Sequence, residues 1–385
     1  MISHKFLSSF RWSSVAAVLL AFVTSIISVQ AQTSDNGDAT AAPVTFTQQK
    51  TPNPLITNFA FGISGDSESD IWTVGAFSQA MHFDGSTWHA VSMALPFMAD
   101  MRAVSLLSPS DVWAVGSVFD STTQHYTSTI QHFDGKKWSV VPSPHFATGD
   151  QLFGVKAIAS TDVFAAGESH SDNQKPLPLI EHFDGIRWSV VPTPPLKKGQ
   201  TLTLGPIAAI SSTDVWVTGH TFPPRAAILH FDGQKFQNVP FPLAQATLGG
   251  LAAIATNDVW VVGGQSKNNA LATLTAHWDG KDWTVVSSPN LTTVNELRAI
   301  SAISSTDIWA VGCTACGADI GVNQTGVIEH WDGKQWTINP SPPIGRGVSP
   351  FGVLGFSSGG VYVSGTSVSQ FQKFQNLVLH ATEGN

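Results

Sequence analysis

One short pattern recurs along most of the chain and restricts the folds that the chain can adopt. It reads HFDGSTW from His82, HFDGKKW from His132, HFDGIRW from His182, HFDGQKF from His230, HWDGKDW from His277, HWDGKQW from His330 and a shortened HATEGN from His380. Successive histidines are 50, 50, 48, 47, 53 and 50 residues apart. Recurrence at a nearly fixed period indicates a repeated structural unit, and this period is too long for a heptad.

A second motif runs in phase with the first. It reads DIWTVG at Asp70, DVWAVG at Asp111, DVFAAG at Asp162, DVWVTG at Asp214, DVWVVG at Asp258, DIWAVG at Asp307 and GVYVSG at Gly360. Each motif therefore occurs seven times, which predicts seven copies of one unit.

Each unit divides into four short strands. From Leu297, LRAISAISSTDIWAVG is followed by a loop and then by GVIEHWDGKQWTINPSPP. SSTD separates the first two strands and WDGK the last two, and Asp-Gly is a hairpin signal because Gly reaches positive φ at little cost. The second strand is apolar at successive positions, so both of its faces must be buried. Four antiparallel strands in about 50 residues predict a propeller blade.

The repeated aromatic and polar residues are predicted to be structural. Of 13 tryptophans, five lie in the DVW position, five in the DGxxW position and two in HWDG, where they can pack between blades. Equivalent histidines on adjacent blades should be about 10 Å apart, the spacing of packed sheets. Ligands of one zinc ion must each lie about 2 Å from it. We therefore expect no metal site from these histidines.

The two ends of the chain complement each other. The seventh copy lacks a Trp-led strand, whereas FTQQKTPNP from Phe46 matches WTVVSSPNL from Trp283, with the same spacing to Pro52 and Pro289. The N-terminal segment should complete the last blade and leave no open edge. The sequence thus predicts an all-β fold, a seven-bladed β-propeller of four-stranded antiparallel blades that is closed by an N-terminal strand.

Residues 1–31 have the features of a secretory signal peptide. Lys5 and Arg11 precede the apolar run VAAVLLAFVTSIISV, which ends in the small residues of VQA. A membrane anchor is the alternative, but the run is short for a span. We expect cleavage after Ala31, a secreted or periplasmic protein and no later membrane span. The polar residues 32–42 predict a flexible linker, and residues 43–385 a single propeller domain.

The order of strands resembles the kelch repeat. An inner strand, an aromatic-rich strand ending in Gly, an outer strand ending near Asp-Gly and a Trp-led strand follow one another over nearly all of residues 43–385. The chain is also similar to exported bacterial propellers. The resemblance implies a propeller fold and no particular activity.

Charge and motifs exclude several functions. The formal net charge is −8, and 12 of the 27 acidic residues belong to the two repeated motifs. Because the 19 basic residues never form a run longer than two, we expect no nucleic-acid partner. No HExxH, Walker or GxSxG motif occurs. With Tyr126 and Tyr362 as the only tyrosines, a sialidase-like site lacks its nucleophile. We therefore assign no catalytic residue and no cofactor.

The leading hypothesis is an exported, non-catalytic binding module, a monomer whose partner is a protein or a surface glycan. The alternative is an extracellular propeller enzyme, glycosidase- or lyase-like, that acts on polysaccharide or sugar. Turns 1–2 and 3–4 of each blade emerge on one face and are short, whereas the other connections emerge on the opposite face and vary. Variable loops on a rigid scaffold often bind partners. Aromatic, His and Arg residues of these loops are the candidate binding residues: Phe119, His125, Tyr126, His145, Phe146, His170, Arg225, Arg346, Phe371 and Phe374.

The only two cysteines form a CxxC pair, Cys313 and Cys316. They follow the second strand of a blade, whereas a thioredoxin-like motif opens a helix. In an exported chain the pair predicts a loop disulfide, and two free thiols are the alternative.

Overall fold

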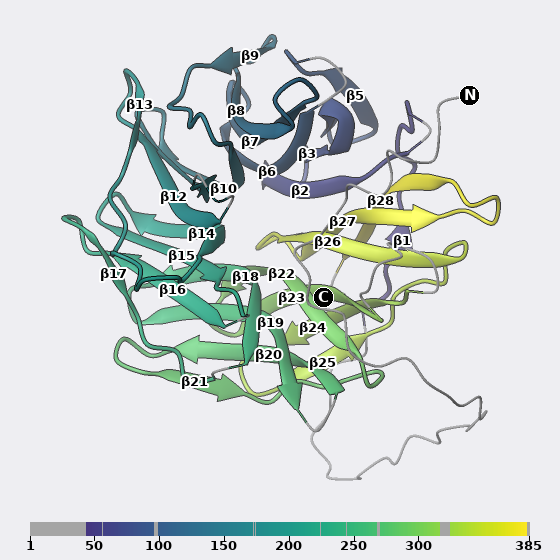
Figure 1. Cartoon of the computed structure of the whole chain (residues 1–385). Helices are drawn as coiled ribbons and strands as arrows, with labels where there is room; N and C mark the ends of the chain where they lie inside the picture. Colours follow the sequence, from purple (N-terminus) through teal and green to yellow (C-terminus); the bar gives the residue numbers. More distant parts are fainter. Residues whose placement is uncertain are drawn as a thin grey trace. The chain divides into compact units, whose positions relative to one another are not determined.

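Each sequence repeat folds into one four-stranded antiparallel sheet, and seven such sheets surround a common centre (Figure 1). The computed structural model describes residues 44–55, 57–95, 99–171, 173, 175–223, 225–243, 245–267, 270–315 and 324–382. The predicted signal peptide, 1–31, and linker, 32–42, lie outside the described residues. The predicted seven blades of four strands are confirmed.

The first three blades contain β2 to β13. Blade 1 consists of β2 (Ala60–Ser67), β3 (Asp70–Gly75), the 3-10 turn η2 (Ala76–Ser78), β4 (Gln79–Phe83) and β5 (Trp88–Ser92). Blade 2 consists of β6 (Ala99–Ser108), β7 (Asp111–Asp120), β8 (His125–Phe133) and β9 (Trp138–Val141). Blade 3 consists of β10 (Asp150–Ala159), β11 (Asp162–His170), β12 (Pro176–Phe183) and β13 (Trp188–Val190).

The next three blades contain β14 to β25. Blade 4 consists of β14 (Thr203–Ser211), β15 (Asp214–His220), β16 (Ala226–Phe231) and β17 (Phe236–Asn238). Blade 5 consists of β18 (Ala246–Ala255), β19 (Asp258–Lys267), β20 (Ala270–Trp278) and β21 (Trp283–Val286). Blade 6 consists of β22 (Asn295–Ser304), β23 (Asp307–Thr314), β24 (Gly326–Trp331) and β25 (Trp336–Asn339).

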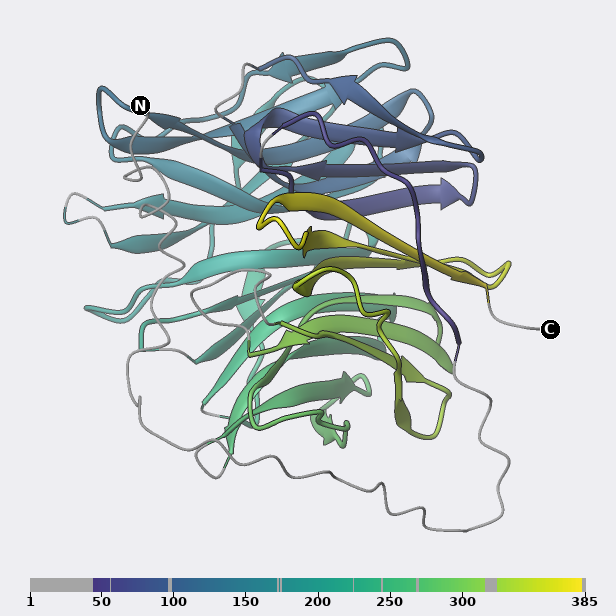
Figure 2. The same cartoon turned by 90° about the vertical axis from the view of Figure 1, so that its right-hand side faces the viewer.

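Blade 7 joins the two ends of the chain. It consists of β26 (Gly347–Gly355), β27 (Gly360–Val368), β28 (Phe374–Thr382) and the N-terminal β1 (Thr47–Gln48). Thr47 pairs with His380 and Gln48 with Leu379. Figure 2 shows the purple N-terminal segment running beside the yellow C-terminal strands. The predicted closure is confirmed, although the paired strand is shorter than residues 44–53.

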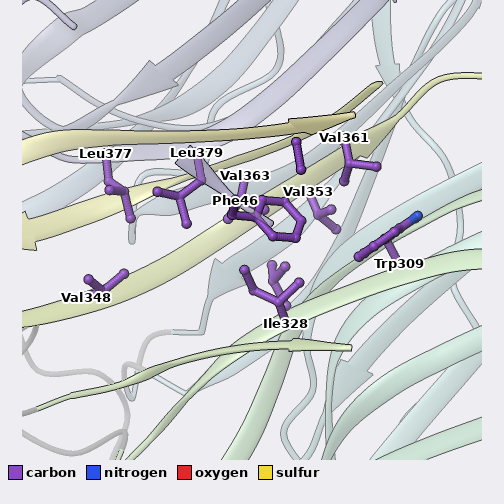
Figure 3. Packing of buried hydrophobic residues seen from close by; sticks show 11 residues of the cluster. Phe46, Trp309, Ile328, Val348, Val353, Val361, Val363, Leu377 and Leu379 are labelled. Carbon is purple, nitrogen blue, oxygen red and sulfur yellow. The ribbon is translucent and has the colours of Figure 1, made fainter. Parts of the chain in front are cut away.

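Phe46 anchors this closing segment. It is 3% exposed and packs among Leu379, Val363 and Ile328 (Figure 3). Its ring meets Trp309 of blade 6 edge-on, with 5.7 Å between centroids. Trp188 meets Trp113 of the preceding blade in the same manner at 5.6 Å. Phe46 therefore takes the place of the Trp that leads the fourth strand in other blades.

Close backbone approach explains the Gly that ends the second motif. A Cβ added to Gly116 would lie 2.0 Å from the carbonyl oxygen of Asp100 on the neighbouring inner strand. The other six equivalent positions are Gly75, Gly167, Gly219, Gly263, Gly312 and Gly365, where the same contact would be 1.6–2.4 Å. Any side chain there would separate the first and second strands of its blade.

Antiparallel connectivity gives the ring two different faces. We call the first the Asp–Gly face, formed by the turns between strands 1 and 2 and by the 3–4 turns at residues 84–87, 134–137, 184–187, 232–235, 279–282 and 332–335. We call the second the loop face, formed by the 2–3 connections and the links between blades. Its described parts include residues 76–78, 121–124, 142–149, 191–202, 239–243, 287–294, 340–346 and 369–373.

Candidate functional site

The repeated His, Asp and aromatic residues form one internal unit per blade. In blade 2, Asp111 Oδ1 accepts hydrogen bonds from His132 Nε2 at 2.9 Å and from Trp113 Nε1 at 2.8 Å. The His132 ring lies over Trp113 with 4.4 Å between centroids. In the other five complete copies the His–Asp distances are 2.7–3.0 Å, in the pairs His82–Asp70, His182–Asp162, His230–Asp214, His277–Asp258 and His330–Asp307. These residues hold strands 2 and 3 together.

The seventh unit is completed by a residue from another blade. Gly360 stands where the other blades have Asp, and His380 stacks on Tyr362 at 4.3 Å between centroids. Glu68, from the first turn of blade 1, places its carboxylate over Gly360, where an added Cβ would lie 2.2 Å from it. Glu68 Oε2 lies 3.7 Å from His380 Nε2, and Ser358 Oγ donates to Glu68 Oε1. Glu68 thus supplies the missing carboxylate and joins blade 1 to blade 7.

The aspartates of the Asp–Gly turns also have a structural role. Asp134 Oδ1 accepts from the backbone N–H groups of Lys137 and Lys136, at 2.9 Å each. These bonds stabilise the carboxylate, so they lower the pKa of Asp134. Gly135 has φ +87°, and an added Cβ would lie 2.9 Å from Ser110 Cβ of the adjacent turn. These hydrogen bonds fix the backbone of the turn. They also occupy the Asp134 carboxylate, which an enzyme would need free to act as an acid or a base.

The ten candidate binding residues all come from the loop-face end of the ring. The sequence assigned them to loops, but five lie in strands, because the hairpins extend further than predicted. These five are Phe119, His125, Tyr126, His170 and Phe374. His145, Phe146, Arg225, Arg346 and Phe371 lie in connections and are exposed.

Several of these residues gather where blade 2 meets blade 3. The rings of Phe119 and Tyr126 are 5.1 Å apart between centroids. His145 Nδ1 lies 3.4 Å from Ser128 Oγ. His170 Nε2 lies 3.4 Å from Glu168 Oε1, and this hydrogen bond raises the pKa of His170. The structure therefore brings candidates from two blades into one region.

Exposed phenylalanines distinguish the loop face. All three phenylalanines that are exposed in the described part of the chain lie there, with exposed fractions of 38% for Phe146, 66% for Phe222 and 87% for Phe371. Phe222 was not among the candidates predicted from the sequence, although it lies in the same variable connection as Arg225. On the Asp–Gly face the most exposed large apolar side chain is Ile186, at 88%.

A row of arginine and phenylalanine residues lies on the inner strands of four successive blades. The Arg102 guanidinium of blade 2 lies 4.7 Å from the centroid of Phe61 in blade 1. Phe61 meets Phe351 of blade 7 edge-on at 5.2 Å, and the Arg298 guanidinium of blade 6 lies 5.1 Å from the Phe351 centroid. We call these four residues the Arg–Phe row. None of the four was predicted from the sequence, because the candidate residues came from variable connections and these four lie on inner strands.

A backbone irregularity positions the Arg–Phe row. In each of these blades the pairing register between strands 1 and 2 shifts by one residue at the member of the row. The residues directly before and after it are paired with strand 2, but it is not itself paired. A bulge residue has no partner on the adjacent strand, so its side chain can be redirected. Burial lowers the pKa of both arginines, opposed by Asp100 near Arg102 and by Glu296 near Arg298.

Two carboxylates, Asp100 beside Arg102 and Glu168 in β11 of blade 3, have partners within the protein. Asp100 Oδ2 lies 3.6 Å from Arg102 Nη2. Glu168 accepts from Thr203 Oγ1 at 2.5 Å and from Gln151 Nε2 at 3.3 Å. These carboxylates link strands and blades, and each is occupied by protein donors.

Two further carboxyl groups are enclosed in the blades. Glu181 in β12 and Glu329 in β24 have 0% exposure, and none of their carboxyl oxygens has a hydrogen-bond partner among the described residues. Burial raises the pKa of each to about 8, and the nearby Asp150 charge adds to the effect at Glu181. Ser288 lies near Glu329, but its hydroxyl donates to Thr273 Oγ1 at 2.6 Å.

Three further expectations concern the cysteines, metals and membranes. Cys313 is buried at the end of β23, but Cys316 lies outside the described residues, so their disulfide stays a prediction. Within the described ranges, no group of three His, Cys, Asp or Glu side chains is arranged to hold a metal ion. The same part of the chain contains no helix of the length and hydropathy that a membrane span requires.

Comparisons with known proteins support the fold alone. No family model matches the chain, and no curated protein matches it. The chain is similar to the structure of YCF48 bound to D1 peptide, with a TM-score of 0.56, 14% identity and coverage of 89% of this chain and 96% of that one. The chain is also similar to the WD40 β-propeller domain of Doa1, with a TM-score of 0.57, 11% identity and coverage of 90% of this chain and 98% of that one. The likeness to the GH74 xyloglucanase from Xanthomonas campestris has a TM-score of 0.58 and 10% identity, and it covers 87% of this chain and 55% of that one.

Proposed function

We propose that this chain is an exported, kelch-like interaction module that binds a protein partner through its loop face and performs no chemistry of its own. The observation that carries the proposal is the set of exposed phenylalanines on the loop face, Phe146, Phe222 and Phe371, together with the Arg–Phe row on the inner strands. Phe and Arg are enriched in protein interfaces, whose central anchors are aromatic or guanidinium groups. A rigid ring that presents variable connections suits such a role.

Partner recognition accounts for these residues better than an enzyme does. The repeated His and Asp residues are bonded inside the blades, and Asp100 and Glu168 are held by protein donors. Glu181 and Glu329 are enclosed, so a substrate cannot reach them. A glycosidase requires a pair of accessible carboxyl groups on either side of the scissile bond. The xyloglucanase likeness concerns the fold and carries no catalytic residue over to this chain.

A protein partner is favoured over a surface glycan by the composition of the face. The exposed rings come from three different connections, a spread that suits a broad protein surface. Among proteins with a similar fold, the structure of YCF48 includes a bound D1 peptide. That precedent concerns YCF48, and it supports protein binding as one use of such a ring.

Site-specific photocrosslinking in the producing cells tests the proposal. A photoreactive phenylalanine analogue replaces Phe146, Phe222 or Phe371, and Ile186 on the Asp–Gly face serves as the matched exposed position. We expect the three loop-face positions to yield the same discrete protein adduct and Ile186 to yield none. An adduct confined to Ile186, or the absence of a protein adduct at all four positions, would refute the proposal.

A further inference from the structure

Exposed carboxylates are distributed unequally over the two faces of the ring, whereas exposed cations occur on both, those of the Asp–Gly face being Lys136, Lys137, Arg187, Lys235, Lys281 and Lys334. All eight exposed acidic residues in the described ranges belong to the Asp–Gly face: Asp66, Asp84, Asp134, Asp184, Asp232, Asp279, Asp282 and Asp332. Every exposed charged residue that the structure describes on the loop face is a cation: Lys50, Lys175, Lys197, Lys198, Arg225, Lys267, Arg346 and Lys373. The formal charge of −8 for the whole chain conceals this unequal distribution of carboxylates.

Several other acidic residues are withdrawn from solvent. Asp150, Glu181 and Glu329 have 0% exposure, and Glu168 has 7%. The partly exposed Asp120 carboxylate accepts from the backbone N–H of Thr122 at 2.7 Å. Among the described residues, Asp120 is thus the carboxylate on this face that lies nearest to solvent, and cations outnumber carboxylates there.

The cations are spread along much of the rim. Lys175 lies on blade 3, Arg225 on blade 4, Lys267 on blade 5 and Lys373 on blade 7, while Lys197 precedes blade 4. The exposed phenylalanines belong to the same face, whereas the Arg–Phe row lies on the inner strands, within the first five residues from the loop-face end of each. A ligand on the loop face would therefore meet both positive charge and exposed aromatic rings.

We propose that the loop face binds an acidic polypeptide segment that also carries apolar side chains. Its Asp and Glu carboxylates would contact Arg225, Arg346 and the lysines, and its apolar residues would contact the exposed phenylalanines. Arg can bind a carboxylate in a bidentate manner, which adds specificity to attraction. At about 0.1 M salt the Debye length is about 10 Å, so the carboxylates of the Asp–Gly face are screened from the ligand. This inference rests on the proposed function and specifies the partner's chemistry.

Peptide titration tests the inference. The probe is a labelled synthetic peptide of alternating Glu and Phe residues separated by Ser, and a peptide with Lys in place of Glu is its control. Affinity is measured by fluorescence anisotropy at several salt concentrations. We expect binding of the acidic peptide only, with an affinity that falls as salt rises, because released counterions contribute to ionic association.

Charge-reversed variants locate the binding face. The double variant Lys197→Glu with Lys198→Glu reverses two exposed positive charges on the loop face. Arg225→Glu with Arg346→Glu reverses two others on the same face. Lys136→Glu with Lys137→Glu makes the same charge change on the Asp–Gly face. We expect each loop-face pair to weaken binding by about tenfold or more and the control pair by less than about twofold. Unchanged melting temperatures establish that all variants fold.

Three outcomes overturn the inference: no binding of the acidic peptide, equal losses in all three double variants, or preferential binding of oligogalacturonate, which would assign the face to an anionic glycan. The crosslinking experiment remains independent of these results. If loop-face positions still crosslink a protein while the acidic peptide fails to bind, the protein-binding function stands and the acidic partner does not.

Discussion

Glu181 and Glu329 should make the propeller most stable in mildly acidic solution. Burial raises the pKa of each carboxyl from 4.5 to about 8. The folded state therefore holds each proton more tightly than the unfolded chain does. Below pH 4.5 both states are protonated and neither carboxyl destabilises the fold. As the pH rises from 4.5 through about 8, the unfolded state gains relative stability, because its carboxyls ionise first.

The size of this effect follows from the two pKa values. At roughly 1.4 kcal/mol for each pH unit, the difference between 4.5 and about 8 corresponds to about 5 kcal/mol per carboxyl. At pH 7 about 3 kcal/mol per carboxyl has already been lost. Such an amount is large beside the 5–15 kcal/mol that separates typical folded domains from their unfolded state.

The chain itself offers a neutral replacement. Gln131 occupies the same repeat position in blade 2, has 0% exposure and accepts from Ala94 N at 2.9 Å. We expect Glu181→Gln with Glu329→Gln to raise the free energy of unfolding at pH 8 and to change it little at pH 4.5. Denaturant melts from pH 4.5 to 8.5 measure this difference, and Asp282→Asn provides the matched change at an exposed acid. If the double variant lost stability with pH as steeply as the unchanged protein, the reasoning would be wrong.

Three shorter predictions concern the architecture. Trp113→Ala should cost about 3–5 kcal/mol, because a 3%-exposed ring is removed from between His132 and Trp188; a loss below about 1 kcal/mol in chemical denaturation would refute its packing role. Deletion of residues 44–53 should lower the melting temperature by exposing β28, and a variant that melts like the full protein would argue against closure by β1. Gly360→Asp should destabilise the protein when Glu68 is present, because an added Cβ lies 2.2 Å from that carboxylate. In a Glu68→Ala background the same change should stabilise it, and a calorimetric double-mutant cycle with additive effects would contradict this account.

Repetition made the fold predictable. Seven copies of two motifs predicted seven blades, because each copy indicates the same order of strands. The spacing from Phe46 to Pro52 matches the fourth strand of the other units and predicted the closure. The successive apolar residues of the second strand predicted burial on both faces, and all six residues of β3 are buried. The strand ends were less predictable, because the hairpin that carries Phe119 and Tyr126 continues pairing into residues that read as a loop.

The candidate site was only partly predictable. The variable connections identified the loop face, but Glu68 replaces an absent Asp through a contact between the first and last blades, which no single repeat contains. Bulges that position Arg102 and Arg298 depend on strand pairing, and the sequence carries no direct sign of pairing shifts. The distribution of exposed carboxylates was available from the sequence, because Asp134 and its equivalents occupy the Asp–Gly turns, whereas Lys197 and Arg225 lie in connections of the other face.

Hydrogen–deuterium exchange of the protein with and without its ligand tests the central claim most directly, using either the crosslinked partner or the acidic peptide. The account predicts slower exchange on binding in residues 121–124, 142–149 and 369–373 of the loop face, and unchanged exchange in the turns at 84–87 and 134–137. Slower exchange confined to those turns, with the loop face unaffected, would contradict the account.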